Sequence, residues 1–292
     1  MQLAALITLG IKTSIVLTTL GLGLSATPRD AVFLFRDPGR LLRSLAAMML
    51  IVPLFAIIVA RSFELDPAVT IALGALSVSP VPPLWPRKAR QAGGHDSYTI
   101  GLLAATALLS IVMIPIGVEI VDGIFSIPMQ ISVGDIATVA FVTVLGPLAA
   151  GITVRRFAPT LAIRAARPVT LVATALLVVC VIPVLYKAWP SMTQLIGNGT
   201  LLTMVAFVVV GLIAGHILGG PSQEDRSVLA LACASRHPGI ALAIASASVP
   251  GEKVVLPAVL LYLIVSSIAT LPYLRWSKGQ VEHEHRPMMA VR

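Results

Sequence analysis

Two short stretches of this chain place chemically active or helix-breaking residues inside apolar runs. The stretch nearer the C-terminus is Ser235-Arg236-His237-Pro238-Gly239. A guanidinium can hold a carboxylate through two parallel hydrogen bonds, and an imidazole can titrate near neutral pH. The chemistry available is therefore anion binding by Arg236 and proton transfer by His237. The first stretch has four prolines, at Pro80, Pro82, Pro83 and Pro86.

Both stretches lie within predicted membrane-spanning helices. The 292 residues are 57% hydrophobic and 12% charged, with a mean hydropathy of +0.94. Soluble domains have about 25% charged residues, so this composition excludes a soluble enzyme or a disordered chain. Runs of about 20 apolar residues, the length that crosses a bilayer, occur at 2–24, 41–60, 67–85, 98–121, 132–154, 168–186, 199–219, 227–247 and 254–274. We therefore predict an all-α polytopic membrane protein of about nine helices.

The basic residues indicate the orientation of these spans. They gather at the odd-numbered junctions and in the tail, and only Arg61, Lys187 and Lys253 lie at even-numbered junctions. The positive-inside rule places the basic side in the cytoplasm. We therefore expect a multi-pass protein of the inner (plasma) membrane, with the N-terminus outside and the C-terminus cytoplasmic. This asymmetry explains the net charge of +8 without a nucleic-acid partner.

A cleaved signal peptide is the alternative for residues 1–26. Such a peptide begins with a basic region before its apolar run, and here the first basic residue is Lys12. We expect the segment to be a membrane span.

The prolines predict that the third span is interrupted. Proline has no amide hydrogen and clashes with the preceding turn of a helix, so the chain should be unwound between about Ser79 and Pro83. The eighth span should break at its middle, within the stretch from Ser235 to Gly239 that contains the helix breaker Pro238. Irregular backbone at membrane depth is tolerated only where protein or a water-filled cavity satisfies it. Two passive proline kinks are the alternative.

The positions of the two breaks favour a transporter. The third and eighth spans run antiparallel and hold equivalent places if spans one to four form an inverted repeat of spans six to nine. Interrupted segments at matching places in two inverted halves indicate the binding site of a secondary transporter.

Several motifs resemble those of the bile acid:sodium symporter family. Residues 21–30, Gly-Leu-Gly-Leu-Ser-Ala-Thr-Pro-Arg-Asp, are similar to its G-x-G-L-[ST]-x-[ST]-P-x-D signature. Ser79-Pro80 and Gly94-His95-Asp96 resemble the Cys-Pro and Gly-Asp on either side of its first crossover. Residues 236–241 resemble its second crossover. The resemblance covers about residues 15–276.

The resemblance implies a panel domain that rocks against a core domain with two crossing discontinuous helices. In the nine-helix form of the family, spans one, five and six form the panel. The implied divisions are residues 1–40 for the first panel helix and its junction, 41–121 for the first core part, 122–190 for the other panel helices, 191–276 for the second core part, and 277–292 for a cytoplasmic tail.

This chain departs from the family at the residues implied to bind sodium. Where the family has Ser-Asn at the first crossover, this chain has Trp85-Pro86. The shared glutamate of the second crossover becomes Ala232, and the glutamine four residues later becomes Arg236. None of these side chains offers an oxygen to Na⁺. Backbone carbonyls, with Thr106 or Ser110 nearby, are the remaining oxygen ligands, so we expect the family's sodium coupling to be lost.

Arg236 needs a partner, because a guanidinium inside a span costs about 2.5–3.5 kcal/mol on insertion scales. No carboxylate lies near the middle of any span. Arg236 is therefore predicted to bind an anionic substrate or to replace the missing cation; in the alternative, it only caps carbonyls of the unwound third span. His237 is either a proton carrier or a neutral hydrogen-bonding group.

The predicted function is secondary active transport of a small amphipathic organic anion by alternating access. We predict that the substrate contacts Ser79, Pro80, Pro83, Trp85, Thr106, Ser235, Arg236 and His237. His237 and Ser110 are the candidates for the coupling ion, with H⁺ favoured over Na⁺, and no metal or other cofactor is expected. A membrane sensor or scaffold is the first alternative. The second is an intramembrane enzyme using His95, Asp96 and His237, although no catalytic motif supports it.

Overall fold

A computed structural model describes residues 2–125, 132–248 and 255–289, and these segments are almost entirely helical. Lys253 and Arg292 lie outside them. Within the described residues, eight helical segments are long and apolar enough to cross a membrane. The third predicted span adds a shorter apolar helix, Pro67–Val78. The prediction of an all-α polytopic protein of about nine helices is confirmed.

The helices of the first half follow the predicted spans closely. They are α1 (Gln2–Ser25), α2 (Pro28–Ala31), η1 (Leu34–Arg36), α3 (Pro38–Leu45), η2 (Ala46–Ile51), α4 (Val52–Ser62), α5 (Pro67–Val78), α6 (Trp85–Gln91) and α7 (Asp96–Phe125). The segment η2 is a π-helical turn that joins α3 to α4. These three elements form one continuous span.

The second half contains the remaining elements. They are α8 (Val133–Ala140), η3 (Phe141–Leu145), α9 (Gly146–Phe157), α10 (Pro159–Gln194), α11 (Thr200–Leu218), α12 (Gln223–Cys233), α13 (Pro238–Ser248), α14 (Val255–Ala269) and α15 (Leu271–Met289). A second π-helical turn, η3, joins α8 to α9. The 36 residues of α10 extend for about 54 Å at 1.5 Å per residue, which is longer than predicted and longer than the apolar core of a bilayer.

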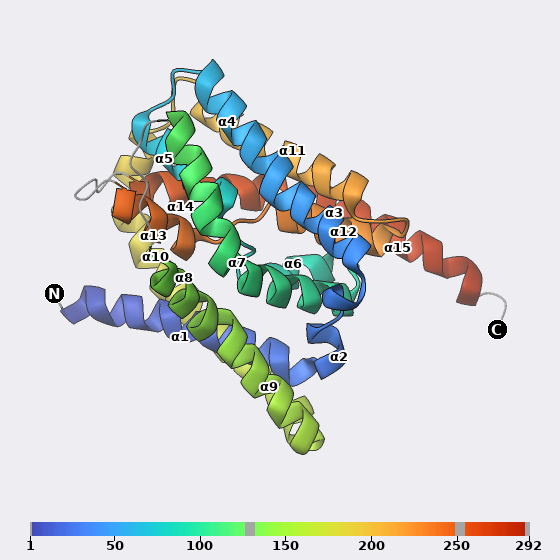
Figure 1. Ribbon diagram of the computed structural model, residues 1–292. Helices are drawn as coiled ribbons and strands as arrows, with labels where there is room; N and C mark the ends of the chain where they lie inside the picture. Colours follow the sequence, from blue (N-terminus) through green and yellow to red (C-terminus); the bar gives the residue numbers. More distant parts are fainter. Residues whose placement is uncertain (1, 126–131, 249–254, 290–292) are drawn as a thin grey trace.

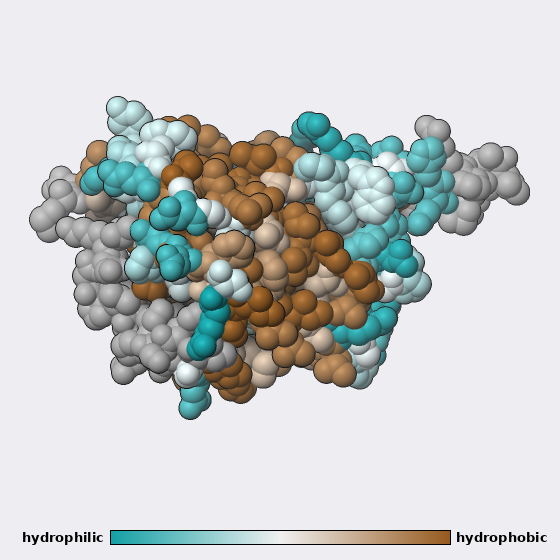
Figure 2. Space-filling model, turned by 90° about the horizontal axis from the view of Figure 1, so that it is seen from above, coloured by the Kyte–Doolittle hydropathy of each residue, from teal (hydrophilic) through white to brown (hydrophobic). Residues whose placement is uncertain are grey.

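One face of the bundle has a broad apolar zone. In Figure 2 a brown zone covers the middle of the visible face, with hydrophilic residues gathered on both sides of it. The N- and C-termini lie on opposite sides of the molecule (Figure 1). We call the end with the α1–α3 connection, α6 and α15 the basic end, because it has Arg29, Arg36, Arg87 and Arg90. These features describe a multi-pass membrane protein.

Helices α1, α9 and α10 pack along one another as a three-helix group. Small residues allow the close approach: a Cβ atom on Gly23 would lie 2.5 Å from the carbonyl oxygen of Leu148, and one on Gly151 would lie 2.6 Å from that of Leu20. Gly21 and Gly23 of the signature motif thus serve helix packing, as small residues do in membrane proteins. The other long helices pack around the two interrupted spans, α5–α6 and α12–α13.

Both predicted interruptions are present. Helix α5 ends at Val78 and α6 begins at Trp85, while α12 ends at Cys233 and α13 begins at Pro238. At the first break, the prolines supply no amide hydrogens to continue α5. At the second break, Pro238 starts a new helix at the position where proline's fixed φ angle is favourable.

The last helix continues beyond its predicted end. Ser277 of α15 is fully buried, and its hydroxyl donates to the carbonyl oxygen of Ala92 (3.3 Å) and accepts from the side-chain amide of Gln223 (3.1 Å). The helix α15 therefore joins the end of α6 to the start of α12 at the basic end.

Candidate functional site

The two interrupted spans meet at their breaks. The backbone amide of His237 donates to the carbonyl oxygen of Pro80 (2.9 Å). One terminal nitrogen of Arg236, Nη1, donates to the carbonyl oxygen of Ser79 (3.1 Å). Arg236 is 1% exposed and Ser79 is fully buried. The unwound backbone is thus satisfied by protein, as membrane depth demands.

The second terminal nitrogen of Arg236, Nη2, donates to the carbonyl oxygen of Met48 in η2 (2.9 Å). Two local features leave this oxygen available. In the π-helical turn, the amide of Val52 bonds the carbonyl of Ala47, and the residue five after Met48 is Pro53, which has no amide hydrogen. The guanidinium therefore links three spans through backbone carbonyls, as expected if it caps the unwound segment.

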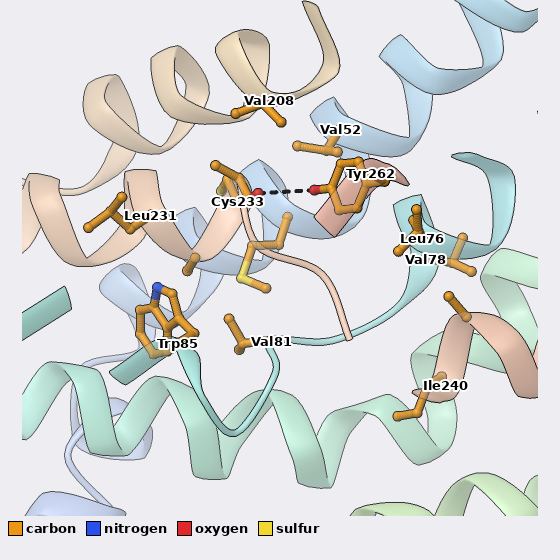
Figure 3. Packing of buried hydrophobic residues seen from close by; sticks show 14 of the residues in the cluster. Val52, Leu76, Val78, Val81, Trp85, Val208, Leu231, Cys233, Ile240 and Tyr262 are labelled. Atoms are coloured by element: carbon orange, nitrogen blue, oxygen red, sulfur yellow. Dashed lines mark hydrogen bonds between the residues drawn. The ribbon is translucent and has the colours of Figure 1, made fainter. Parts of the chain in front are cut away.

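The carbonyl oxygen of Ala234 is also satisfied across the bundle. It lies just past the end of α12 and accepts bonds from the hydroxyl of Tyr262 (3.0 Å) and that of Ser266 (2.8 Å), both on α14. Figure 3 shows Tyr262 and Trp85 among the buried residues around the crossing. Backbone atoms freed by the second break are thus held by α14.

Four buried polar atoms at the crossing have no hydrogen-bond partner within the described part of the chain. They are Nε1 of Trp85, Oγ of Ser235, Nε of Arg236 and Nε2 of His237. The other ring nitrogen of His237, Nδ1, accepts from the amide of Ile240 (3.3 Å). An acceptor at Nδ1 corresponds to an imidazole protonated on Nε2. Nearly all buried polar groups are paired in proteins, so this cluster is a candidate ligand site.

Thr106 and Ser110 are held by their own helix. The hydroxyl of Thr106 donates to the carbonyl oxygen of Leu102 (2.7 Å), and that of Ser110 to the carbonyl oxygen of Ala107 (2.7 Å). Both residues are buried on α7. The structure therefore brings together Ser79, Pro80, Ser235, Arg236 and His237, and places Thr106 and Ser110 in bonds of α7.

Pro83 lies in a separate cleft at the basic end. The cleft has a volume of about 330 Å³ and is bounded by α1 and α10 on one side and by the start of α6 on the other. Its walls include Arg87, Arg90 and Arg167 together with the apolar side chains of Leu22 and Leu171. It therefore combines positive charge with apolar surface.

Two of these arginines have partners at the cleft. Arg87 donates through Nη1 to the hydroxyl of Thr174 on α10 (2.5 Å), and Arg90 pairs with Asp96 (2.6 Å). Arg167 is exposed and has no acidic partner among the described residues. The contact between Arg87 and Thr174 joins an interrupted span to the three-helix group.

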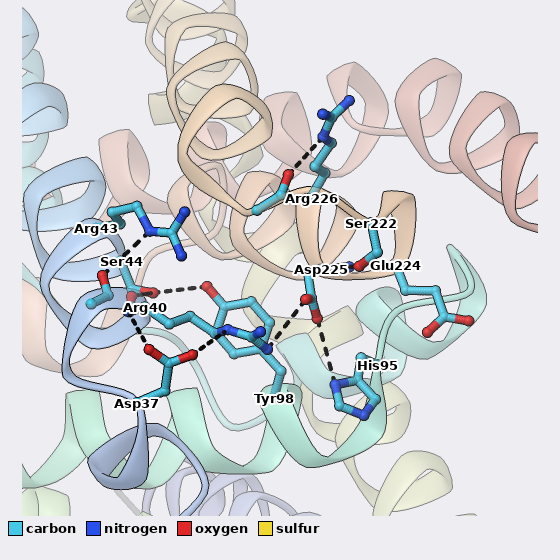
Figure 4. Close-up of polar contacts among 12 residues, drawn as sticks. Asp37, Arg40, Arg43, Ser44, His95, Tyr98, Ser222, Glu224, Asp225 and Arg226 are labelled. Carbon is cyan, nitrogen blue, oxygen red and sulfur yellow. Dashed lines mark hydrogen bonds and ion pairs between the residues drawn. The ribbon is translucent and has the colours of Figure 1, made fainter.

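A polar cluster at the basic end connects α3, α7 and α12 (Figure 4). Arg40 pairs through Nη1 with Oδ2 of Asp225 (3.2 Å), and Nδ1 of His95 lies 3.5 Å from Oδ1 of the same carboxylate. The hydroxyl groups of Tyr98 and Ser44 are 2.7 Å apart. The Asp225 carboxylate raises the pKa of His95 above its usual 6.5, against the opposing effect of burial.

Three parts of this arrangement could not be predicted from the sequence. Met48 bonds Arg236, and the hydroxyls of Tyr262 and Ser266 bond Ala234, so both contacts join segments that are distant in sequence. Only the first has a local signal, because Pro53 has no amide hydrogen for the carbonyl of Met48. In the sequence, Arg167 is one of several basic residues at the junction between the fifth and sixth predicted spans. Its place opposite α6 depends on how α10 packs.

Comparison with known proteins identifies the family. No curated protein matches the chain significantly. The model of the Sodium Bile acid symporter family matches residues 13–195, which is more than half of the chain. The match includes the first interrupted span, α9, α10 and the second half of α1. The chain therefore belongs to the sodium bile acid symporter family, a family of transporters.

Proposed function

We propose that this protein is a secondary active transporter that moves a small amphipathic organic anion by alternating access. The observation that supports this most directly is the contact of two interrupted spans around the buried guanidinium of Arg236. In this proposal the two spans belong to inverted repeats, and the three-helix group α1, α9 and α10 is the panel that moves against them. The basic end lies on the cytoplasmic side of the inner membrane, as positive-inside distributions favour.

The cleft at the basic end supports an anionic, amphipathic substrate. Arg87, Arg90 and Arg167 supply positive charge to its walls, and Leu22 and Leu171 supply apolar surface. Guanidinium groups bind carboxylate, sulfate or phosphate oxygens in pairs. The cleft lies between the proposed panel and α6, where a relative movement of the two would open or close it. From there a substrate reaches the polar cluster at Ser235, Arg236 and His237.

Arg236 takes the role of a fixed cation in this proposal. Backbone carbonyls of Ser79 and Met48 bind its Nη atoms as they would bind a metal cation at unwound backbone. A covalently held charge cannot leave the site with the substrate. Transport is therefore independent of Na⁺. His237, whose Nε2 has no hydrogen-bond partner among the described residues, is the candidate for proton coupling.

Counterflow in sealed proteoliposomes tests the transport proposal. Vesicles loaded with an unlabelled organic anion should accumulate the labelled anion, equally in sodium and choline buffers. Arg167→Gln should raise the half-saturating concentration, while Arg164→Gln, an exposed arginine of the same helix outside the cleft, should not. Absence of counterflow for every tested anion that raises the melting temperature would favour the sensor or scaffold.

The enzyme alternative has less geometric support. His95 contacts Asp225 and Asp96 contacts Arg90, whereas His237 contacts Pro80 and Ile240. The described residues thus show no hydrogen-bonded triad of His95, Asp96 and His237. Conversion of an anion without exchange across the bilayer is the result that would support an enzyme.

A further inference from the structure

A second, larger hollow lies on the membrane-facing side of the bundle. It is a groove of about 820 Å³ between α7 and the α8–η3–α9 segment. Ala104 and Leu148 are buried at its floor, while Leu108 and Phe141 are 48% and 64% exposed. Thr138 is the one polar side chain among the described residues that line it. The groove is thus apolar along its length and has a volume typical of ligand pockets.

The groove exists because α7 packs against α8 and η3 but makes little contact with α9. In Figure 1, α9 runs away from α7 toward the side of the molecule on which α2 lies. Ala31 of α2 and Ile152 of α9 line the groove. The groove therefore extends from α8 toward the basic end of the bundle.

Positive charges cluster where the groove reaches the basic end. Arg29 is two residues before Ala31, and Arg155 and Arg156 lie three and four residues after Ile152. The spacings of three and four residues place Arg155 and Arg156 on the same face of α9 as Ile152, and Arg29 lies in the same short helix, α2, as Ala31. Arg29 and Arg156 are exposed and Arg155 is half-buried, and none of the three has an acidic partner among the described residues.

We propose that this groove binds an anionic phospholipid, with an acyl chain along α7 and α9 and the phosphate group at Arg29, Arg155 and Arg156. An apolar hollow does not hold ordered water, and in a bilayer the available apolar occupant is an acyl chain. Basic residues between spans at the basic side of a membrane attract anionic headgroups. The proposal is independent of what the protein transports, because it needs only the membrane setting.

The groove and the 330 Å³ cleft differ in the position of their arginines and in the helices that form them, so lipid binding and substrate binding can be tested separately. The cleft includes arginines in its walls, whereas the groove has its arginines beyond its end. The cleft residues belong to α1, α6, the break that precedes α6, and α10, and the groove residues belong to α2, α7, α8, η3 and α9. Substitutions in the groove therefore leave the cleft intact.

The test uses the full-length protein after removal of copurified lipid. Phosphatidylglycerol or phosphatidylcholine with the same acyl chains is added, and the melting temperature and the lipids retained in native mass spectrometry are measured. Ala149→Phe fills the groove, and Ala150→Phe is the matched control, an exposed neighbour outside the lining. A double substitution, Arg155→Gln with Arg156→Gln, is compared with Arg43→Gln with Arg164→Gln, which removes the same charge from exposed sites elsewhere.

We expect phosphatidylglycerol to raise the melting temperature of the wild type more than phosphatidylcholine does, since a ligand of the native state stabilises it. Ala149→Phe should lose at least half of that increase, and Ala150→Phe should retain it. The Arg155 and Arg156 double variant should lose the preference for phosphatidylglycerol, and its charge-matched control should keep it. Equal shifts with both lipids, or full retention of phosphatidylglycerol by Ala149→Phe and by the double variant, would overturn the proposal.

Discussion

The backbone amide of His237 donates a 2.9 Å hydrogen bond to the carbonyl oxygen of Pro80. The bond joins the break of the eighth predicted span to the break of the third. The residues that precede these two, Arg236 and Ser79, are hydrogen-bonded to each other as well, so each break satisfies backbone groups of the other. This contact explains how two unwound segments persist inside an apolar bundle.

The fixed-cation role of Arg236 predicts a gain of sodium binding when the charge is removed. Arg236→Gln leaves the carbonyls of Ser79 and Met48 without their donors and supplies an amide oxygen. Unsatisfied buried groups cost about 1–3 kcal/mol each, so the variant should melt at a lower temperature than the wild type. Na⁺, and not K⁺ at equal ionic strength, should restore part of the loss.

The same measurement on the wild type is the control. Its melting temperature should not respond to Na⁺, because the guanidinium occupies the carbonyls. A sodium-dependent shift in the wild type comparable to that of the variant would contradict the fixed-cation role.

The carbonyl of Ala234 predicts non-additive substitutions on α14. Tyr262→Phe and Ser266→Ala each remove one of its two donors, so each single variant should lose little stability. The double variant leaves the buried carbonyl unpaired, and its loss should exceed the sum of the single losses by about 1–3 kcal/mol. Chemical unfolding of the four proteins measures this coupling, and simple additivity would show that water or another group replaces the donors.

Close packing of α11 on α12 predicts a large effect at Gly215. A Cβ atom there would lie 2.5 Å from backbone atoms of Ala230, so Gly215→Ala should destabilise the protein by about 1–3 kcal/mol through overpacking. Gly279→Ala is the control, since nothing lies within 4 Å of its added Cβ and alanine favours a helix. Equal melting temperatures for the two variants would disprove the close approach.

The pair of His95 and Asp225 predicts a pH-dependent stability. Asp225 raises the pKa of His95 above 6.5, so the charged imidazole stabilises the fold fully below about pH 6.5, and this contribution is lost as pH rises through the folded pKa. The groups around His95 are Asp225 and Glu224 of α12, Arg40 of α3 and Asp30 of α2.

Melting temperatures between pH 5.5 and 8.5 measure this effect. The decline above pH 6.5 should be smaller in His95→Gln and unchanged in His283→Gln, which alters an exposed residue of α15. Identical pH profiles for the wild type and His95→Gln would exclude a contribution from this pair.

The class of fold and the places where its helices are interrupted could be predicted from the residues alone. Apolar runs of bilayer length must be helical because lipid offers no hydrogen-bond partners. Prolines at 80, 82 and 83 have no amide hydrogens to continue a helix, and this holds however the rest of the chain packs. These are local constraints, so they could be predicted without knowing any neighbour.

The contacts of the buried polar groups, in contrast, depend on how the helices pack in three dimensions. Arg236 bonds Met48 and Ser79, which are distant in sequence, and Arg167 reaches the cleft because α10 packs on α1. The sequence showed that a buried guanidinium needed an acceptor and that no carboxylate was near, but carbonyl oxygens belong to every residue. A carbonyl oxygen loses its usual helical donor where its own helix breaks or forms a π-helical turn, and it can then accept a bond from a distant side chain. The packing of the helices determines which of these carbonyls lies within reach of Arg236.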